Sequence, residues 1–368
     1  MGPATSAPPR QGGAGRPAGD RPLDLDATRL AEVFGIPDLP DRLAAVDARI
    51  TSALGAGGAL LAPATVRVAS SGGKRLRPLF TIVCAATGGV FDGSVVDAAA
   101  AVELVQLGSL VHDDILDAAT TRRGRPTINA LEGVNHAVLA GDYILARAAE
   151  LAAGVSQQAA ALVATALGDL CEGQVMEIRD AHDPDRSVGA HLASVRGKTA
   201  ALFECACRLG AHCAGAGAES EDALGRFGRA FGMGFQVLDD VLDLVGDESR
   251  LGKPTGNDIA SGVYTLPVLA ALRGPEGELL RSTLAATAGA DRGEAVDRAV
   301  EIVRRSGAIA EALVAVDRYA DASRRAVAHL NQTVVGEGLG RFPRLYATWA
   351  LDTLADPRYD EVPPPAGS

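Results

Sequence analysis

Two short acidic motifs with the same spacing are the residues of this sequence best suited to catalytic chemistry. Each reads Asp-Asp-x-x-Asp, and the members are Asp113, Asp114 and Asp117 in the first motif and Asp239, Asp240 and Asp243 in the second. Apolar residues surround both motifs and predict a buried helix, on which the first and last aspartates share one face, one turn apart. Like charges on an apolar helix are unfavourable unless a cation neutralises them. Mg²⁺, held by one or two carboxylates and by phosphate oxygens, would supply that charge.

Either acidic motif alone would fit a solvated acidic helix face equally well. Two copies far apart in the sequence favour two acidic helices that face each other across a helical bundle. Metal ions held between them would be bridged by a diphosphate. We therefore expect the two motifs to meet at one cavity.

Two basic segments could bind the anionic part of such a substrate. Lys74, Arg75 and Arg77 follow a pair of glycines at a predicted loop-to-helix junction, where backbone N–H groups and positive side chains suit a diphosphate. Taken alone, this segment also fits an ordinary basic turn. Arg122 and Arg123 follow the first acidic motif, and the Gly-Arg-Pro turn behind them can bring both arginines back over the carboxylates. Carboxylates for metal beside arginines for phosphate indicate a substrate that is a phosphate ester.

Long amphipathic segments separated by Gly, Asp or Pro must position these residues. The 368-residue chain is 47% hydrophobic and has no sustained strand-like alternation, which predicts an all-α fold, a single large helical bundle around a central cavity. Residues 1–22 read as a disordered tail, residues 23–356 as the helical domain, and residues 357–368 as a C-terminal tail. The predicted helical windows are 95–118, 134–153, 156–180, 187–210 and 219–245, with further helices over 265–356.

Composition narrows the functional class. A net charge of −11 argues against nucleic-acid binding through phosphate neutralisation. The five cysteines form no C-x-x-C pair and favour reduced thiols in the cytoplasm. We find no secretory signal and expect no apolar run long enough to span a bilayer. A lipid product would leave from a soluble body or from a surface in peripheral contact with a membrane.

Five segments in fixed order carry a resemblance to a known family. They are GGKRLRP (72–78), LVHDDILDAATTRRGRPT (110–127), AGDYILARA (140–148), GKTAALF (197–203) and GFQVLDDVLDLVGDESRLGKPTGND (234–258). With these segments, which span half of it, the chain resembles the trans-isoprenyl diphosphate synthases of the polyprenyl synthetase family, of the long-chain type. The resemblance implies the isoprenoid synthase fold and a homodimer. It also implies a prenyltransferase that condenses isopentenyl diphosphate head-to-tail with an allylic diphosphate.

The resemblance also implies a role for each matching residue. Mg²⁺ would be held by Asp113, Asp117 and Asp239, with Asp114, Asp240 and Asp243 close by. The allylic diphosphate would be contacted by Arg122, Lys198, Thr199, Gln236 and Lys253, and isopentenyl diphosphate by Lys74, Arg77, Gln106 and Arg123. Catalysis would rest on Asp113, Asp117, Arg122, Lys198 and Asp239. Many members have His where Gln106 stands. Many also have Lys where Val263 stands, so this chain lacks one cation at the diphosphate site.

The resemblance further implies that residues below the first acidic motif, namely Gly108 and Ser109, determine product length. Because no Phe, Tyr or Trp lies between Val102 and His112, an unblocked tunnel should admit a product of geranylgeranyl length or longer. Bulk from a neighbouring helix could instead close that tunnel. His112 itself is expected to be structural, and the remaining histidines ordinary.

Two other functions compete with the synthase. A class I terpene cyclase would need only one diphosphate site and usually lines its pocket with aromatics, whereas this chain is 4% aromatic. A non-catalytic subunit of a heteromeric synthase would not need two intact acidic motifs. The second motif and the two basic segments therefore favour the synthase.

Overall fold

The computed structural model describes residues 25–247, 255–289 and 291–356, and these residues are almost entirely helical. The N-terminal half comprises α1 (Ala27–Phe34), α2 (Leu39–Gly55), α3 (Gly58–Ala69), α4 (Leu76–Ala86), α5 (Gly93–Leu116), α6 (Ile128–Glu132), α7 (Val134–Val155) and α8 (Gln157–Arg179). The C-terminal half comprises α9 (Val188–Val195), η1 (Arg196–Ala200), α10 (Ala201–Cys213), α11 (Ala218–Val245), α13 (Asn257–Ala260), α14 (Leu266–Leu272), α15 (Gly277–Ala286), α16 (Arg292–Arg305), α17 (Ala308–Ala326), η2 (Ala328–Leu330) and α18 (Val334–Leu354). The expected all-α fold is confirmed.

Side-chain caps explain where several helices begin. Asp92 accepts hydrogen bonds from the backbone N–H groups of Ser94 and Val95 at the start of α5. Ser156 and Ser187 cap α8 and α9 in the same way. Each cap satisfies N–H groups that have no partner within the helix. The observed starts therefore lie within two residues of those predicted for these three helices.

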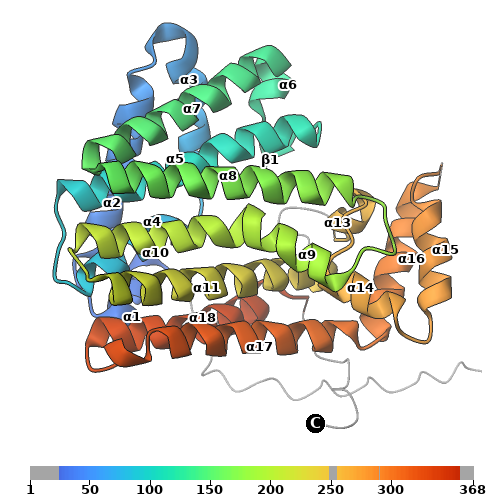
Figure 1. The fold of residues 1–368 in the computed structure, drawn as a ribbon. Helices are drawn as coiled ribbons and strands as arrows, with labels where there is room; N and C mark the ends of the chain where they lie inside the picture. The colour runs from blue at the N-terminus through green and yellow to red at the C-terminus, as the bar shows by residue number, and fades with distance from the viewer. Residues whose placement is uncertain (1–24, 248–254, 290, 357–368) are drawn as a thin grey trace, which may run out of the picture.

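The helices form layers that place α5 and α11 in the interior (Figure 1). α8, α10, α11 and α17 run side by side, with α5 and α7 above them, while α13 to α16 gather at one end. α5 packs mainly on α7, and α11 packs mainly on α17 and α10. α10 packs on both α5 and α11, so it connects the two helices that carry the acidic motifs.

Aromatic side chains are few but lie together in the core. Phe80 of α4 contacts Phe203, Phe227, Phe231 and Phe342 with ring centroids 4.7–5.9 Å apart, mostly edge to face. Edge-to-face pairs are favourable beyond the apolar area that they bury. This cluster ties α4, α10, α11 and α18 together.

A short β-hairpin, whose strands have two residues each, follows α5 where the sequence predicted only a turn. β1 (Thr121–Arg122) pairs antiparallel with β2 (Arg125–Pro126). The two residues between the strands, Arg123 and Gly124, both have positive φ, at 51° and 70°. Positive φ at both central positions is typical of the turn that matches the twist of a hairpin.

The expectation that no segment could span a bilayer is wrong by length and composition alone. α5 has 24 residues and is apolar enough to cross a membrane, but 72% of its most apolar window is buried inside the fold. The hydrophobicity of α5 reflects its central position in a bundle. The two predicted tails lie outside the described residues, so their boundaries stay predictions.

Candidate active site

Both acidic motifs contribute to one cavity of about 130 Å³. Asp117 comes from the end of α5 and Asp240 from α11, and both line it. The other lining residues come from α8, α9, η1, α11 and the segment that holds α13: Glu177, His191, Val195, Lys198, Thr199, Gln236, Asn257, Asp258, Ser261, Val263 and Thr265. The expectation that the two motifs meet at a shared hollow is therefore confirmed.

The three aspartates of the first motif differ in their surroundings. Asp117 is exposed, Asp113 is half-buried and Asp114 is buried. Asp114 accepts a hydrogen bond of 2.6 Å from Nε of Arg122. Burial raises the pKa of Asp113, and the charge of Lys198 opposes that rise while Asp117 adds to it. A carboxylate with a raised pKa is one that gains from a nearby cation.

The second motif shows the same division. Asp239 is exposed, whereas Asp240 and Asp243 are 2% and 1% exposed. Asp240 accepts a hydrogen bond of 3.0 Å from Nε2 of Gln236, and Asp243 accepts one of 3.1 Å from the backbone N–H of Asp258. These bonds hold the carboxylates of Asp240 and Asp243 against other protein groups.

Asp114, Asp240 and Asp243 were expected to lie close to the metal held by Asp113, Asp117 and Asp239. Each of the three bonds to another protein group through one carboxylate oxygen. Their role at the metal stays a prediction. Among the described residues, no three Asp, Glu, His or Cys side chains lie close enough to hold one ion together. Such a set is not needed for Mg²⁺, which takes one or two carboxylates and completes its shell with water and phosphate oxygens.

Lys198 and Thr199 lie on a π-helical turn, η1, between α9 and α10. The sequence predicted one continuous helix here. Nζ of Lys198 bonds to Oε1 of Glu177 at 2.5 Å. Burial lowers the pKa of Lys198, but the charges of Glu177, Asp113 and Asp117 outweigh it, so the pKa lies above its ordinary value. Single π-helical turns often occur at functional sites because they redirect side chains.

Two glycines allow η1 to approach α8 closely enough for this contact. A Cβ on Gly173 would collide with the backbone N of Lys198, and a Cβ on Gly197 would lie 2.5 Å from the carbonyl oxygen of Asp169. Backbone approach at this distance excludes any side chain. Gly173 and Gly197 therefore determine where Lys198 sits.

The basic residues expected to bind a second diphosphate form a separate cluster beside the cavity. Arg123 returns to the loop before α4 and donates to the carbonyl oxygen of Gly72. Nζ of Lys74 lies 3.0 Å from the hydroxyl of Tyr346 and 4.6 Å from the ring of Trp349. The guanidinium of Arg77 lies 4.4 Å from the ring of Phe203. We call Lys74, Arg77 and Arg123 the cation cluster.

The electrostatics of the cation cluster favour an anionic ligand. Burial lowers the pKa of Lys74 and of Arg123, and it lowers the pKa of Arg77 to about 10. The charge of Asp239 opposes the effect on Lys74, so Lys74 lies near the second acidic motif. The charge of Glu103 does the same for Arg77 and Arg123. Partly desolvated cations bind an anion more strongly than cations in water.

Comparison with known proteins agrees with this geometry. Residues 59–303 match the model of the Polyprenyl synthetase family. The chain is 36% identical over 284 residues to heptaprenyl diphosphate synthase component 2 of Geobacillus stearothermophilus, covering 77% of this chain and 88% of the relative. It is 39% identical over 264 residues to nonaprenyl diphosphate synthase of Mycobacterium tuberculosis, covering 71% and 78%.

The chain belongs to the polyprenyl synthetase family. Its fold is similar to that of a polyprenyl synthase from Caulobacter crescentus, solved with calcium and isoprenyl diphosphate, with a TM-score of 0.80 and 31% identity over 88% of this chain and 98% of the other. The relatives named above are prenyl diphosphate synthases, and this chain is a prenyltransferase. Neither a terpene cyclase nor a non-catalytic subunit is favoured.

Three positions singled out in the sequence, 106, 253 and 263, belong to neither the acidic motifs nor the cation cluster. Gln106 is half-buried on α5, one turn after Glu103. Val263, at the family's lysine position, lines the shared cavity, so Lys198 is the one lysine or arginine among the described lining residues. Lys253 lies outside the described residues.

The space beside Gly108 is occupied by a neighbouring helix. A Cβ on Gly108 would lie 2.9 Å from Cγ and Cδ2 of Leu145 on α7, and 3.3 Å from the carbonyl oxygen of Gly141. Ser109 is buried and donates to the carbonyl oxygen of Gln106. Leu145 thus supplies the neighbouring bulk that the sequence left open. The roles of Gly108 and Ser109 in product length stay predictions.

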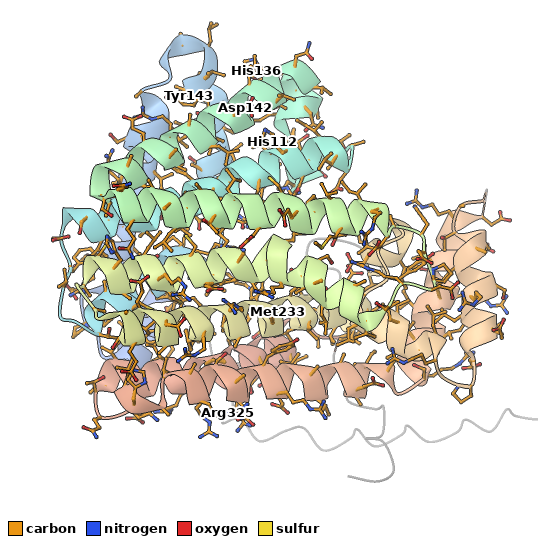
Figure 2. The ribbon with its side chains drawn as sticks, in the orientation of Figure 1. His112, His136, Asp142, Tyr143, Met233 and Arg325 are labelled. Carbon is orange, nitrogen blue, oxygen red and sulfur yellow. The ribbon has the colours of Figure 1, made fainter. Side chains whose placement is uncertain are left out.

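His112 faces α7 (Figure 2). Its Nε2 lies 3.3 Å from the carbonyl oxygen of Val138 and 3.5 Å from Oδ1 of Asp142. These contacts support the structural role expected for this histidine. Met233 of α11, labelled in Figure 2, is 7% exposed and packs in the core against Val195 and Ala200.

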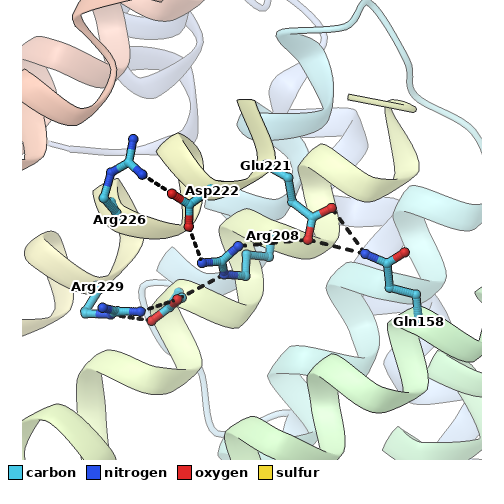
Figure 3. Close-up of polar contacts among 7 residues, drawn as sticks. Gln158, Arg208, Glu221, Asp222, Arg226 and Arg229 are labelled. Atoms are coloured by element: carbon cyan, nitrogen blue, oxygen red, sulfur yellow. Dashed lines mark hydrogen bonds and ion pairs between the residues drawn. The ribbon is translucent and has the colours of Figure 1, made fainter. Parts of the chain in front are cut away.

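A second group of arginines, on α10 and α11, pairs with nearby carboxylates (Figure 3). Arg208 bonds to Glu204 and Asp222 at 2.9 Å each, and Arg229 bonds to both oxygens of Glu204 at 2.5 and 2.6 Å. Arg226 also pairs with Asp222. Because carboxylates already neutralise these arginines, the group differs from the cation cluster. We call Arg208, Arg226 and Arg229, with Glu204 and Asp222, the outer ion-pair group.

Sequence reasoning missed four residues of the site. They are Glu103, which bonds to Arg75 at 2.7 Å, Glu177, Tyr346 and the buried His191. Glu103 carries a detectable signal, since it is the one acid in a long apolar stretch of α5. Tyr346 carries none, because it lies 272 residues from Lys74 in sequence.

Proposed function

We propose that this synthase uses Mg²⁺ to condense isopentenyl diphosphate with an allylic diphosphate and makes a product of geranylgeranyl length or longer. One observation carries the proposal: a cavity lined by acids lies next to a cation cluster. The described lining includes four carboxylates, of Asp117, Glu177, Asp240 and Asp258, but one lysine. A diphosphate would be repelled there unless metal ions came with it.

The donor set fits a hard divalent cation. Asp113 and Asp117 lie one turn apart on α5, Asp239 is exposed on α11, and carboxylate oxygens are the ligands that Mg²⁺ prefers. These three residues would hold the ions, while Asp114, Asp240 and Asp243 support them. The bound metal would stabilise negative charge on the departing diphosphate.

The remaining residues would hold the two substrates at a fixed separation. Lys198, Thr199 and Gln236 line the cavity and would contact the allylic diphosphate. Arg122, which donates to Asp114 and lines a separate pocket, would contact the same diphosphate. The cation cluster would bind isopentenyl diphosphate. Fixing both reactants replaces an encounter in solution with an intramolecular step.

Positive charge at the phosphates would supply the main catalytic effect. As the allylic C–O bond breaks, Lys198 and the arginines stabilise the developing diphosphate charge without reorganising. The isopentenyl double bond then attacks the allylic carbon, and the proton lost from the new chain passes to the released diphosphate. No protein base is required for this sequence of steps.

The cation cluster favours this reaction over cyclisation, because a cyclase ionises a single diphosphate. Incubating the purified protein with Mg²⁺, isopentenyl diphosphate and farnesyl diphosphate should give a longer prenyl diphosphate, detected by chromatography with mass spectrometry. A cyclic hydrocarbon formed from one substrate alone would favour the cyclase. No product of either kind, with folded protein, would contradict the proposal.

A homodimer is the proposed assembly, and α7 and α8 offer the surface for it. These helices pack on each other and expose Val134, Leu139, Val175 and Ile178, each more than half exposed. Large apolar patches on a soluble protein usually mark interfaces, and the same patch on two copies can meet through a two-fold axis.

The assembly can be tested by sedimentation. Val175→Glu should shift the protein from dimer to monomer, while the exposed Val314→Glu on α17 should not. A wild-type monomer at micromolar concentration would contradict the proposal. A relative is named as component 2 of a heptaprenyl diphosphate synthase, so co-purification with a different subunit is the alternative outcome.

The cytoplasm is the proposed location, with peripheral membrane contact at product release. All five cysteines are free thiols, of which Cys84, Cys205 and Cys207 are buried, as expected in a reducing compartment. Cell fractionation should recover the enzyme mainly in the soluble fraction, and recovery with integral membrane proteins would contradict this.

A further inference from the structure

His191 and Asp240 form a buried pair beside the cavity that the mechanism above does not use. They are 2% exposed each, and Nε2 of His191 lies 3.3 Å from Oδ2 of Asp240. Within the described part of the chain, the two ring nitrogens of His191 make no well-aligned hydrogen bond. Oδ2 of Asp240 likewise accepts none from the described residues. Buried polar atoms without partners are costly, and each of these groups is available to the other.

The pair is the end of a chain of contacts that reaches the substrate side. The other oxygen of Asp240 accepts a hydrogen bond of 3.0 Å from Gln236. Oε1 of Gln236 in turn accepts one of 2.8 Å from the hydroxyl of Thr199. Thr199 is adjacent to Lys198 on η1. Every member of this chain lines the same cavity.

We propose that His191 is a positioning residue that anchors Asp240 and thereby sets the orientation of Gln236 and Thr199 toward the allylic diphosphate. An N–H of His191 directed at Oδ2 restrains the carboxylate from both sides. With Asp240 restrained, the Gln236 amide has one favourable orientation, which leaves its Oε1 to accept from Thr199. His191 thereby connects α9 to the acidic helix α11.

The inference rests on the proposed function, and its specific consequence concerns one substrate only. The cation cluster for isopentenyl diphosphate shares none of these contacts. Removing the His191 donor should therefore weaken binding of the allylic diphosphate and leave binding of isopentenyl diphosphate unchanged. A residue that served stability alone would affect both substrates or neither.

Three variants test this consequence in the full-length enzyme. His191→Leu removes the donor, His191→Gln keeps an N–H at a comparable reach, and His212→Leu removes a half-buried histidine that contacts Ser156 at 2.8 Å elsewhere. In His191→Leu the KM for farnesyl diphosphate should rise about tenfold, as expected for one lost hydrogen bond to a charged group. The KM for isopentenyl diphosphate should stay within about twofold. His191→Gln should restore most of the loss, and His212→Leu should change neither KM.

Isothermal titration calorimetry with farnesyl thiolodiphosphate and Mg²⁺ measures binding without turnover. His191→Leu should bind this analogue more weakly than wild type, and His191→Gln should restore most of the affinity. Equal affinity in wild type and His191→Leu would overturn the proposal, as would an equal loss in His191→Gln. If wild type failed to bind this analogue or to elongate farnesyl diphosphate, the proposed function would fail instead.

The anchoring contact can be tested separately from function by denaturant unfolding. The shifts in denaturation midpoint caused by His191→Leu and Asp240→Asn should be less than additive in the double variant, because each change removes the same contact. Additive shifts would overturn the pairing of these two residues.

Discussion

At the scale of single residues, the carboxylates of each acidic motif differ in their exposure to solvent. Asp113, Asp117 and Asp239 have solvent access, while Asp114 and Asp240 are held by Arg122 and Gln236. Spacing alone could not distinguish these groups, since all six aspartates occupy equivalent motif positions. The bonds from Arg122 and Gln236 restrain the carboxylates of Asp114 and Asp240.

Asp239→Asn should reduce kcat by about 10²–10³-fold, since it removes a preorganised charge at the reacting centre. The circular dichroism spectrum should be unchanged because Asp239 is exposed. Steady-state kinetics with farnesyl and isopentenyl diphosphate would measure the effect. Asp222→Asn, in the outer ion-pair group, is the control and should retain kcat. A variant of Asp239 with wild-type kcat would remove this residue from the mechanism.

Tyr346→Phe should raise the KM for isopentenyl diphosphate up to about tenfold without changing kcat, because Lys74 loses the hydroxyl that orients it. Tyr319→Phe is the matched control, since Tyr319 lies on α17 beside Gly234. Initial-rate measurements at varied isopentenyl diphosphate would test both. Equal effects of the two variants would argue against orientation of Lys74 by Tyr346.

At the scale of elements, close helix packing decides where side chains point. The π-helical turn η1 and the glycines at its crossing with α8 place Lys198 beside Glu177. The α5–α7 contact places Leu145 against Gly108. Both features concern the distance between two helices, and both bear on the substrate.

Product length provides a test of the α5–α7 contact. Gly108→Phe should shorten the product, because the ring must occupy space at Leu145. Leu145→Ala should lengthen the product by opening that space. Chromatography of the dephosphorylated products would measure chain length, with the exposed Leu139→Ala as the control. Unchanged length in both variants would place the chain-length determinant elsewhere.

The outer ion-pair group should make part of the stability depend on pH. Burial raises the pKa of Glu204, but hydrogen bonds from Arg229 and Arg208 outweigh it, so the pKa lies below its ordinary value of 4.5. Because the carboxyl of Glu204 has a lower pKa in the folded state than in the unfolded state, its ionised form stabilises the fold at pH values above the unfolded-state pKa. This contribution disappears as the pH falls through the folded-state pKa. The stabilisation should therefore be complete at pH 7 and lost below pH 4.5.

Urea unfolding of wild type and Glu204→Gln from pH 7 to pH 3 would measure this contribution. The difference in free energy of unfolding should be about 1.5–3 kcal/mol at pH 7, the range for hydrogen bonds to charged groups, and should shrink toward zero in acid. Glu32→Gln, in an exposed pair with Arg29, should show little difference at any pH. A constant difference for Glu204→Gln would contradict the assignment.

At the scale of the whole molecule, the acidic cavity and the cation cluster lie side by side, although their residues come from nearly the entire chain. Lys74 belongs to the segment before α4, Asp239 to α11 and Tyr346 to α18. α18 lies beyond the family match at residues 59–303, yet it supplies the group that contacts Lys74. Ligand binding should therefore stabilise the bundle as a unit.

Mg²⁺ and inorganic diphosphate together should raise the melting temperature, whereas diphosphate with EDTA should not, because the cavity is acidic. At a hundredfold excess over Kd the stabilisation is about 2.7 kcal/mol, or a shift of several degrees. Differential scanning calorimetry would measure it, and Asp239→Asn should reduce the shift. An equal shift with EDTA would show that the anion binds without metal.

The sequence by itself determined the helical fold, the two acidic motifs and the basic segments. These features depend on residues a few positions apart, such as the 3.6-residue period that brings Asp113 and Asp117 to one face. Ordered motifs of that kind also sufficed to indicate the family. Local spacing is therefore enough to propose which residues act on the diphosphates.

Only the tertiary structure decided how those residues are divided and supported. The burial of Asp114 and Asp240, the π-helical turn under Lys198, Leu145 beside Gly108 and His191 against Asp240 all depend on packing between distant helices. No local pattern encodes such contacts, because they depend on how closely two helix backbones approach. The sequence thus specifies the chemistry available to the chain, and the packing of the bundle specifies which atoms face the substrate.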